Sequence, residues 1–77
     1  SDPMADLDAA TRRYDETKTA FEAAQSAAIA AALDALRAGK MPTEVADRSP
    51  FTAAYLRRLA REAGIPPAQP GKKPKRR

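Results

Sequence analysis

The stretch PTEVADRSPFTAAYLRRLAREAG, residues 42–64, decides the fold of this 77-residue chain. It holds two helix-forming runs separated by a Ser-Pro pair. A proline opens the first run, which ends near Arg48, and the second run ends near Ala63, just before Gly64. Proline is favoured at the first position of a helix and glycine just after the last. The stretch therefore predicts two short helices joined by a tight turn.

Two residues could cap the second of these helices. Ser49 could cap it with Pro50 at the first helical position, or Thr52 could cap it so that the helix begins at Ala53. We favour Thr52, and the other capping stays open.

Residues 42–64 resemble the helix-turn-helix family of DNA-binding proteins and are similar to small actinobacterial-type regulators that carry such a unit. The positions that match hold apolar or small side chains: Val45, Ala46, Phe51, Leu56 and Leu59. Ala46 is expected to be small because two helices that cross at a short turn approach closely there. Ser49 and Pro50 depart from the family pattern, which most often has an apolar residue and a glycine. The resemblance implies an all-α unit whose second helix reads DNA.

The second helix has two distinct sides at 100° per residue. One side holds Tyr55, Leu56, Leu59, Ala60 and Ala63, and the other holds Ala53, Ala54, Arg57, Arg58 and Arg61. Small residues near the start let a backbone approach bases closely, and arginines one and two turns later can reach guanine edges or phosphates. The predicted DNA contacts of this helix are therefore the cap residue and the second side: Thr52, Ala53, Ala54, Arg57, Arg58 and Arg61. The plain alternative is a solvated helix surface without a ligand.

The composition favours helices throughout the chain. Of its hydrophobic residues, 43% of the sequence, 19 are alanines, which form helices well and need no deep core. Cysteine and histidine are both absent, so disulfides, thiol nucleophiles and the usual zinc sites are excluded. We expect an all-α protein that is not an enzyme and has no cofactor, no metal and no small-molecule substrate.

Charge is distributed unevenly along the chain. Residues 1–36 contain seven acids and three bases, whereas residues 37–77 contain eleven bases and three acids. A strongly basic half indicates an anionic partner, with double-stranded DNA the first candidate. An anionic membrane is less suitable, because no helix has basic residues beside exposed bulky apolar ones.

Upstream, residues 5–38 contain neither proline nor glycine, which predicts one long helix or two nearly collinear ones. Its last part, from residue 27, carries Ile29, Leu33 and Leu36 at helical spacing and is expected to end at Gly39. We therefore predict a compact three-helix unit over residues 27–64.

The earlier part of this helix, residues 5–26, has Leu7, Tyr14 and Phe21 at a spacing of seven. A dimeric coiled-coil arm would cover this stripe and make a homodimer. A DNA site for such a dimer would be a pseudo-palindrome. The alternatives are that the arm packs back onto its own C-terminal unit or frays.

The termini complete the expected organisation. Residues 1–4 are interpreted as a vector-derived scar followed by the native start, and residues 65–77 as a disordered basic tail. The tail would bind phosphates or a minor groove. Its basic residues are Lys72, Lys73, Lys75, Arg76 and Arg77. A nuclear localisation signal has the same composition, and a tail without a target is the plain alternative.

These patterns together predict a sequence-specific DNA-binding protein, either a transcriptional regulator or a nucleoid-associated protein. No apolar run is long enough to span a bilayer, and no leader is evident, so we expect the cytoplasm, at the nucleoid. The alternative is a small helical adaptor or assembly protein whose basic half binds RNA or an acidic protein.

Overall fold

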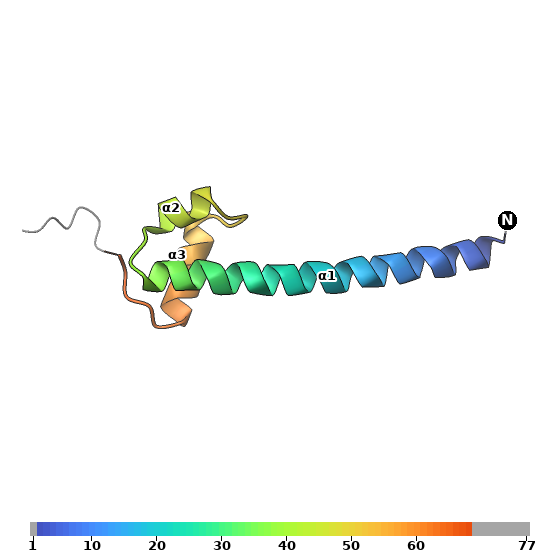
Figure 1. Cartoon of the computed structure of the whole chain (residues 1–77), viewed down its shortest axis with the longest axis horizontal. Coiled ribbons are helices and arrows are strands. Elements are labelled where there is room, and N and C mark those ends of the chain that lie inside the picture. The colour runs from blue at the N-terminus through green and yellow to red at the C-terminus, as the bar shows by residue number, and fades with distance from the viewer. Residues whose placement is uncertain (1, 69–77) are drawn as a thin grey trace, which may run out of the picture.

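The computed structural model describes residues 2–68, and all regular structure within that range is helical. The helices are α1 (Pro3–Arg37), α2 (Pro42–Asp47) and α3 (Ala53–Glu62). The predicted all-α class is therefore confirmed. Helices α2 and α3 pack against the C-terminal end of α1, and the rest of α1 projects away from them (Figure 1). We call residues 28–65 the head and residues 3–27 of α1 the arm.

Helix α1 begins earlier than the sequence suggested. Asp2 is its N-cap, and the Asp2 carboxylate accepts a hydrogen bond from the backbone N–H of Met4 at 2.9 Å. Pro3 occupies the first turn, where its missing N–H is not needed. Residues that we interpreted as a vector-derived scar thus cap and begin the helix, because Asp-Pro is a good start signal whatever its origin.

Gly39 ends α1 with a Schellman motif, in which the backbone adopts a positive φ of 93°. The Gly39 N–H donates to the Leu36 carbonyl at 3.0 Å, and the Lys40 N–H donates to the Ala35 carbonyl at 3.1 Å. These bonds satisfy two of the carbonyls that a helix end leaves free. The chain reverses at this point and leads into α2.

The turn between α2 and α3 uses both of the residues considered as caps. The Thr52 hydroxyl accepts from the Tyr55 N–H at 3.0 Å, so Thr52 caps α3, as favoured from the sequence. The Ser49 hydroxyl accepts from the Phe51 N–H at 3.3 Å. Ser49 therefore shapes the turn rather than the helix, and α3 begins at Ala53.

A second Schellman motif ends α3 at Gly64, whose φ is 73°. The Gly64 N–H donates to the Arg61 carbonyl at 3.1 Å, and the Ile65 N–H donates to the Ala60 carbonyl at 2.8 Å. This reversal returns Ile65 to the core, where it is 9% exposed. Placing Ile65 in a tail with nothing to bury was wrong, because the residue after a C-terminal glycine commonly packs back on the helix.

The core of the head is small and comes from all three helices. Leu56 is fully buried, and Ala32, Leu36, Val45 and Ile65 surround it. Partly buried side chains pack against this cluster: Leu33, Ala35, Ala46, Phe51 and Ala60.

The side of α1 that faces the core differs from the expected stripe. Of Ile29, Leu33 and Leu36, only Leu36 is buried, and Ala32 takes a central place instead. A small side chain at Ala32 lets α2 and α3 approach α1 closely, so the larger leucine at 33 lies at the edge.

Candidate nucleic-acid interface

Helix α3 packs with one side on the core and leaves the other side open. Leu56 anchors it with no exposed surface, whereas Ala54, Arg57, Arg58 and Arg61 are exposed, as is the cap residue Thr52. Four of the five residues expected on the outward side of this helix are therefore accessible.

Ala53 is the exception, so its predicted place on the outward side of α3 is wrong. It is only half exposed, because at 100° per residue it lies about 60° from Leu56 around the helix. The open arc is centred on Ala54 and Arg61, which lie about 20° apart on the same basis. Arg57 lies at one edge of this arc and Arg58 towards the other.

Arg57 and Arg61 converge with a third cation, Lys40, around one groove of the head. The groove runs between the end of α1 and the C-terminal half of α3, and its apolar floor includes Ile65. Within the described residues, neither Arg57 nor Arg61 forms an ion pair. Both guanidinium groups are therefore available to an anion.

Lys40 was not among the predicted contacts. The sequence places it next to the glycine that ends α1, where a basic residue is expected to complement the helix C-terminus. The Schellman reversal at Gly39 brings Lys40 to the groove that Arg57 and Arg61 line. The sequence shows that residue 40 is basic, which is the one signal for a contact there. It does not show that Lys40 lies near Arg57 and Arg61, because that depends on how α3 crosses α1.

Arg58 is in a different environment from the other two arginines of α3. Its guanidinium group pairs with Glu62 at 3.3 Å and lies 5.2 Å from the centre of the Tyr55 ring. Tyr55 in turn contacts Phe51, with 5.4 Å between ring centres. The Arg58–Glu62 pair is exposed and adds little stability, but the two contacts direct Arg58 away from Arg57.

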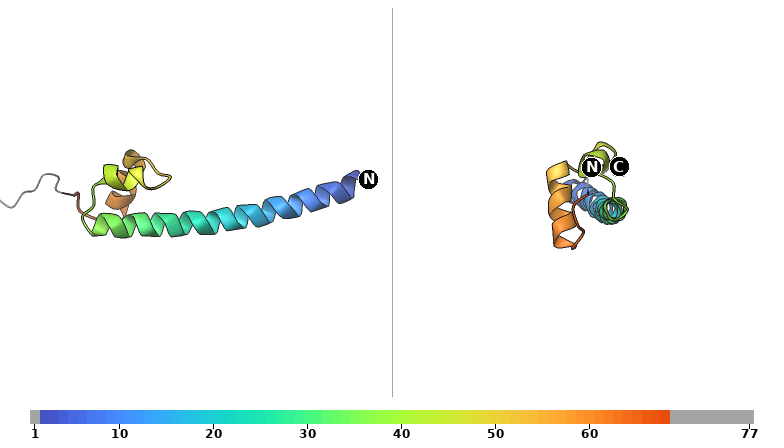
Figure 2. Two further views of the ribbon diagram at one scale, coloured as in Figure 1. Left: turned by 45° about the horizontal axis from the view of Figure 1, so that its top comes forward. Right: turned by 90° about the vertical axis from the view of Figure 1, so that its left-hand side faces the viewer.

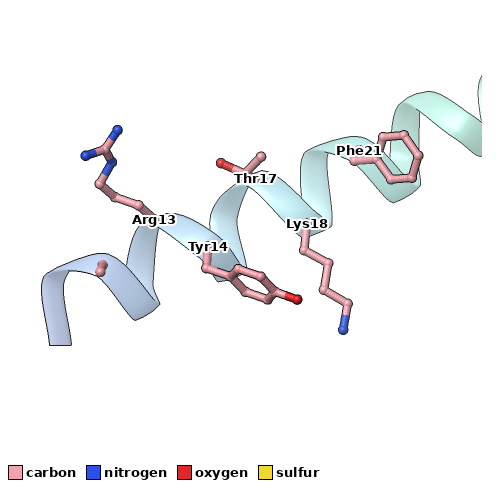
Figure 3. A pocket seen from close by; sticks show the side chains of 6 residues that line it. Arg13, Tyr14, Thr17, Lys18 and Phe21 are labelled. Carbon is pink, nitrogen blue, oxygen red and sulfur yellow. The ribbon is translucent and has the colours of Figure 1, made fainter. Parts of the chain in front are cut away.

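The arm presents a second surface, which is apolar. Leu7, Tyr14 and Phe21 are each more than half exposed, and so is Met4. No residue of the arm is even partly buried, so the alternative in which the arm packs back onto its own head is wrong for this chain. Between Tyr14 and Phe21 lies a shallow groove (Figure 3), lined by Ala10, Arg13, Tyr14, Thr17, Lys18 and Phe21. The expectation that no helix has basic residues beside exposed bulky apolar ones is therefore wrong for the arm, because Arg13 and Lys18 lie beside Tyr14 and Phe21.

Other kinds of site are absent from residues 2–68. This part of the chain has no cluster of three or more carboxylates that could hold a metal ion and no buried polar side chain lacking a hydrogen bond. Its helices include none that is long and apolar enough to cross a membrane. The predicted tail contacts, Lys72, Lys73, Lys75, Arg76 and Arg77, lie outside the described residues.

Comparison with known proteins adds no relative. No protein-family model, curated protein or solved structure matches the chain. Its function is therefore inferred from its own surfaces.

Proposed function

We propose that this protein binds double-stranded DNA in a sequence-specific manner, as a transcriptional regulator or nucleoid-associated protein. In this proposal α2, the turn and α3 act as a helix-turn-helix unit, and α3 enters the major groove. The observation that carries it is the exposed side of α3, where Arg57 and Arg61 lie beside the small residue Ala54 and form no ion pair with any residue between 2 and 68.

The dimensions and chemistry of this side suit a base-reading helix. The major groove of B-DNA is about 12 Å wide and admits an α-helix. Thr52 and Ala54, at the start of α3, are short enough to let the backbone approach the base edges. Arg61 lies two turns after Ala54 on the same line of the helix, where a guanidinium group can bond to guanine O6 and N7.

The remaining cations are assigned to the DNA backbone. Arg58 is already held by Glu62 and Tyr55, so its expected partner is a phosphate rather than a base. Lys40 flanks Arg57 across the groove and would contact a phosphate on the same strand. The basic tail would add affinity without sequence information, because phosphate contacts position a protein and base contacts specify the site.

The adaptor alternative is less well supported at this surface. Sequence-specific RNA binding relies on aromatic side chains that stack on unpaired bases. The two aromatic residues near the arginines, Phe51 and Tyr55, are each half buried and contact one another. Their faces are thus already partly used, which favours duplex DNA over single-stranded RNA.

The test is selection of bound duplexes from a random pool, followed by affinity measurements on the winning site and on scrambled DNA. The double variant Arg57→Ala/Arg61→Ala should lose about 1–3 kcal/mol per guanine contact on the selected site and much less on scrambled DNA. Arg12→Ala, which removes an exposed arginine from the arm, is the control and should leave the ratio of the two affinities unchanged.

The result that would overturn the proposal is a ratio of specific to scrambled affinity that the double variant leaves unchanged. Unchanged helical circular dichroism must accompany the measurement, since none of these side chains is in the core. If the ratio did not change, α3 would not be the sequence reader and the adaptor function would lead.

A further inference from the structure

We propose that the arm pairs with the arm of a second copy of this chain in an antiparallel orientation, with Phe21 of each copy against Ala10 of the other. This proposal does not depend on DNA binding. It rests on three features of the described residues: the side of α1 on which the head lies, the alternation of side-chain sizes along the stripe, and the charges that flank it.

The apolar stripe of the arm and the head lie on the same side of α1. Tyr14 and Ala32 are eighteen residues apart, which is about five turns, so they share one direction around the helix. The same spacing relates Ala10 to Ala28. Ala32 is buried under α2 and α3, and Ala28 is partly buried. The arm also bends gently towards the side on which α2 and α3 lie (Figure 2).

This placement opposes a parallel dimer. In a parallel pair, the partner's α1 would continue along the stripe past residue 28, into the space that α2 and α3 occupy. In a parallel dimer, the two arms would therefore have to move apart before they reach the heads. An antiparallel partner avoids the collision, because its helix ends where the head begins.

The antiparallel register follows from the length of the exposed arm. If Phe21 faces the partner's Ala10, then Tyr14 faces the partner's Thr17 and Leu7 faces the partner's Ala24. The same register brings the partner's first helical residue opposite residue 28. The overlap is therefore residues 3–28, which matches the fully exposed stretch 3–27 and spans roughly 38 Å at 1.5 Å per residue.

Side-chain sizes favour the same arrangement. Large residues recur at Leu7, Tyr14 and Phe21, and the positions between them on the stripe are small, namely Ala10 and Thr17. Antiparallel pairing sets every large residue against a small one. Each pair of facing residues along the stripe then has a similar total volume, so the space between the two helices is filled evenly. Parallel pairing would set large against large and alanine against alanine, which leaves voids in the alternate layers.

The charged residues beside the stripe also discriminate between the two orientations. Arg13 and Lys18 flank the groove at Tyr14. In a parallel pair, Arg13 would lie beside the partner's Lys18, and the repulsion would occur twice by symmetry. In the antiparallel register, Arg13 lies beside the partner's Ala20, and Lys18 lies beside the partner's Thr11. No pair of like charges then flanks the stripe as a nearest neighbour.

This dimer places the two heads at opposite ends of the paired arms. Residue 34, near the point where α3 crosses α1, would lie about 55 Å along the axis from its symmetry mate. If α3 also reads DNA, the two half-sites would be separated by more than one helical turn of the duplex, which is about 34–36 Å. That consequence rests on the proposed function, whereas the orientation of the arms does not.

The test uses spin labels on single cysteines, because the 77-residue sequence has no cysteine. Thr19→Cys and Ser26→Cys are matched sites, since both residues are polar, exposed and seven positions apart on the outer side of the arm. In the antiparallel register, Thr19 lies about 10 Å along the axis from its mate, and Ser26 about 32 Å. Pulsed electron paramagnetic resonance without DNA should give a clearly longer distance for Ser26.

Equal distances for the two labels would mean a parallel dimer, and no dipolar coupling at tens of micromolar would mean no arm dimer. Either result would overturn the proposal. As a second measurement, Phe21→Ala should raise the dimer dissociation constant at least tenfold in sedimentation equilibrium. Thr19→Ala, on the outer side of the same helix, should leave the dissociation constant unchanged.

Discussion

Replacing Leu56 by alanine should largely unfold the head, because Leu56 is its one fully buried side chain. Leu56 has no exposed surface and lies among side chains of α1, α2 and the segment after α3. Removing a buried leucine side chain costs about 2–5 kcal/mol, from the transfer energy of the removed atoms and the cavity left behind. A head of this size has a total stability of about 2–6 kcal/mol at 0.05–0.15 kcal/mol per residue. The substitution therefore removes much of what holds the head together.

The loss should extend to the candidate interface. Helix α3 has 10 residues, and isolated helices shorter than about 12–15 residues are marginal in water. Without the packing of Leu56 against the core, α3 should no longer be helical. Arg57, Arg58 and Arg61 would then no longer lie together on one side of a helix. Site-specific DNA affinity should fall with the population of folded head.

The assay is urea unfolding followed by nuclear magnetic resonance at the amides of Gly39 and Gly64, which end α1 and α3. These signals report the head, whereas total helicity also includes the arm. Leu59→Ala is the matched control, because Leu59 is on the same helix but only half buried. A Leu56→Ala head as stable as the Leu59→Ala head would refute the assignment of Leu56 as the centre of the core.

Two further predictions concern the cap of α3 and the tail. Thr52→Ala should cost about 1 kcal/mol in urea unfolding, because the Tyr55 N–H loses its acceptor. Ser49→Ala should cost less, since its bond to Phe51 closes a turn, and the reverse order would contradict the capping of α3 by Thr52. Deleting residues 72–77 should weaken binding to specific and scrambled DNA alike in filter binding, and lower the salt slope by roughly 0.9 for each phosphate that the protein no longer neutralises. Unequal effects on the two DNAs would show that the tail reads sequence.

The C-terminal ends of α1 and α3 and the start of α3 could be predicted from the sequence because their signals are local. Gly39 and Gly64 adopt the positive φ that glycine allows at a helix end, and Thr52 supplies the acceptor that the first turn of α3 needs. Each of these effects acts within a few residues of the chain. The exposure of Arg57 and Arg61 was predictable in the same way, since charged side chains stay in water unless they are paired.

The composition also set limits that no arrangement of helices could change. The chain lacks cysteine and histidine and contains 19 alanines, so its apolar side chains suffice only for a small core. Composition does not determine which side of each helix forms that core.

The tertiary structure decided which residues face one another. Ala32 rather than Leu33 is buried under α2 and α3, Ala53 turns partly inward, and Ile65 folds back into the core. Lys40 reaches the groove beside Arg57 for the same reason. Each outcome depends on the angles at which three helices cross, because a residue is buried only if another element lies over it. The periodicity of a single helix carries no information about where its neighbours lie.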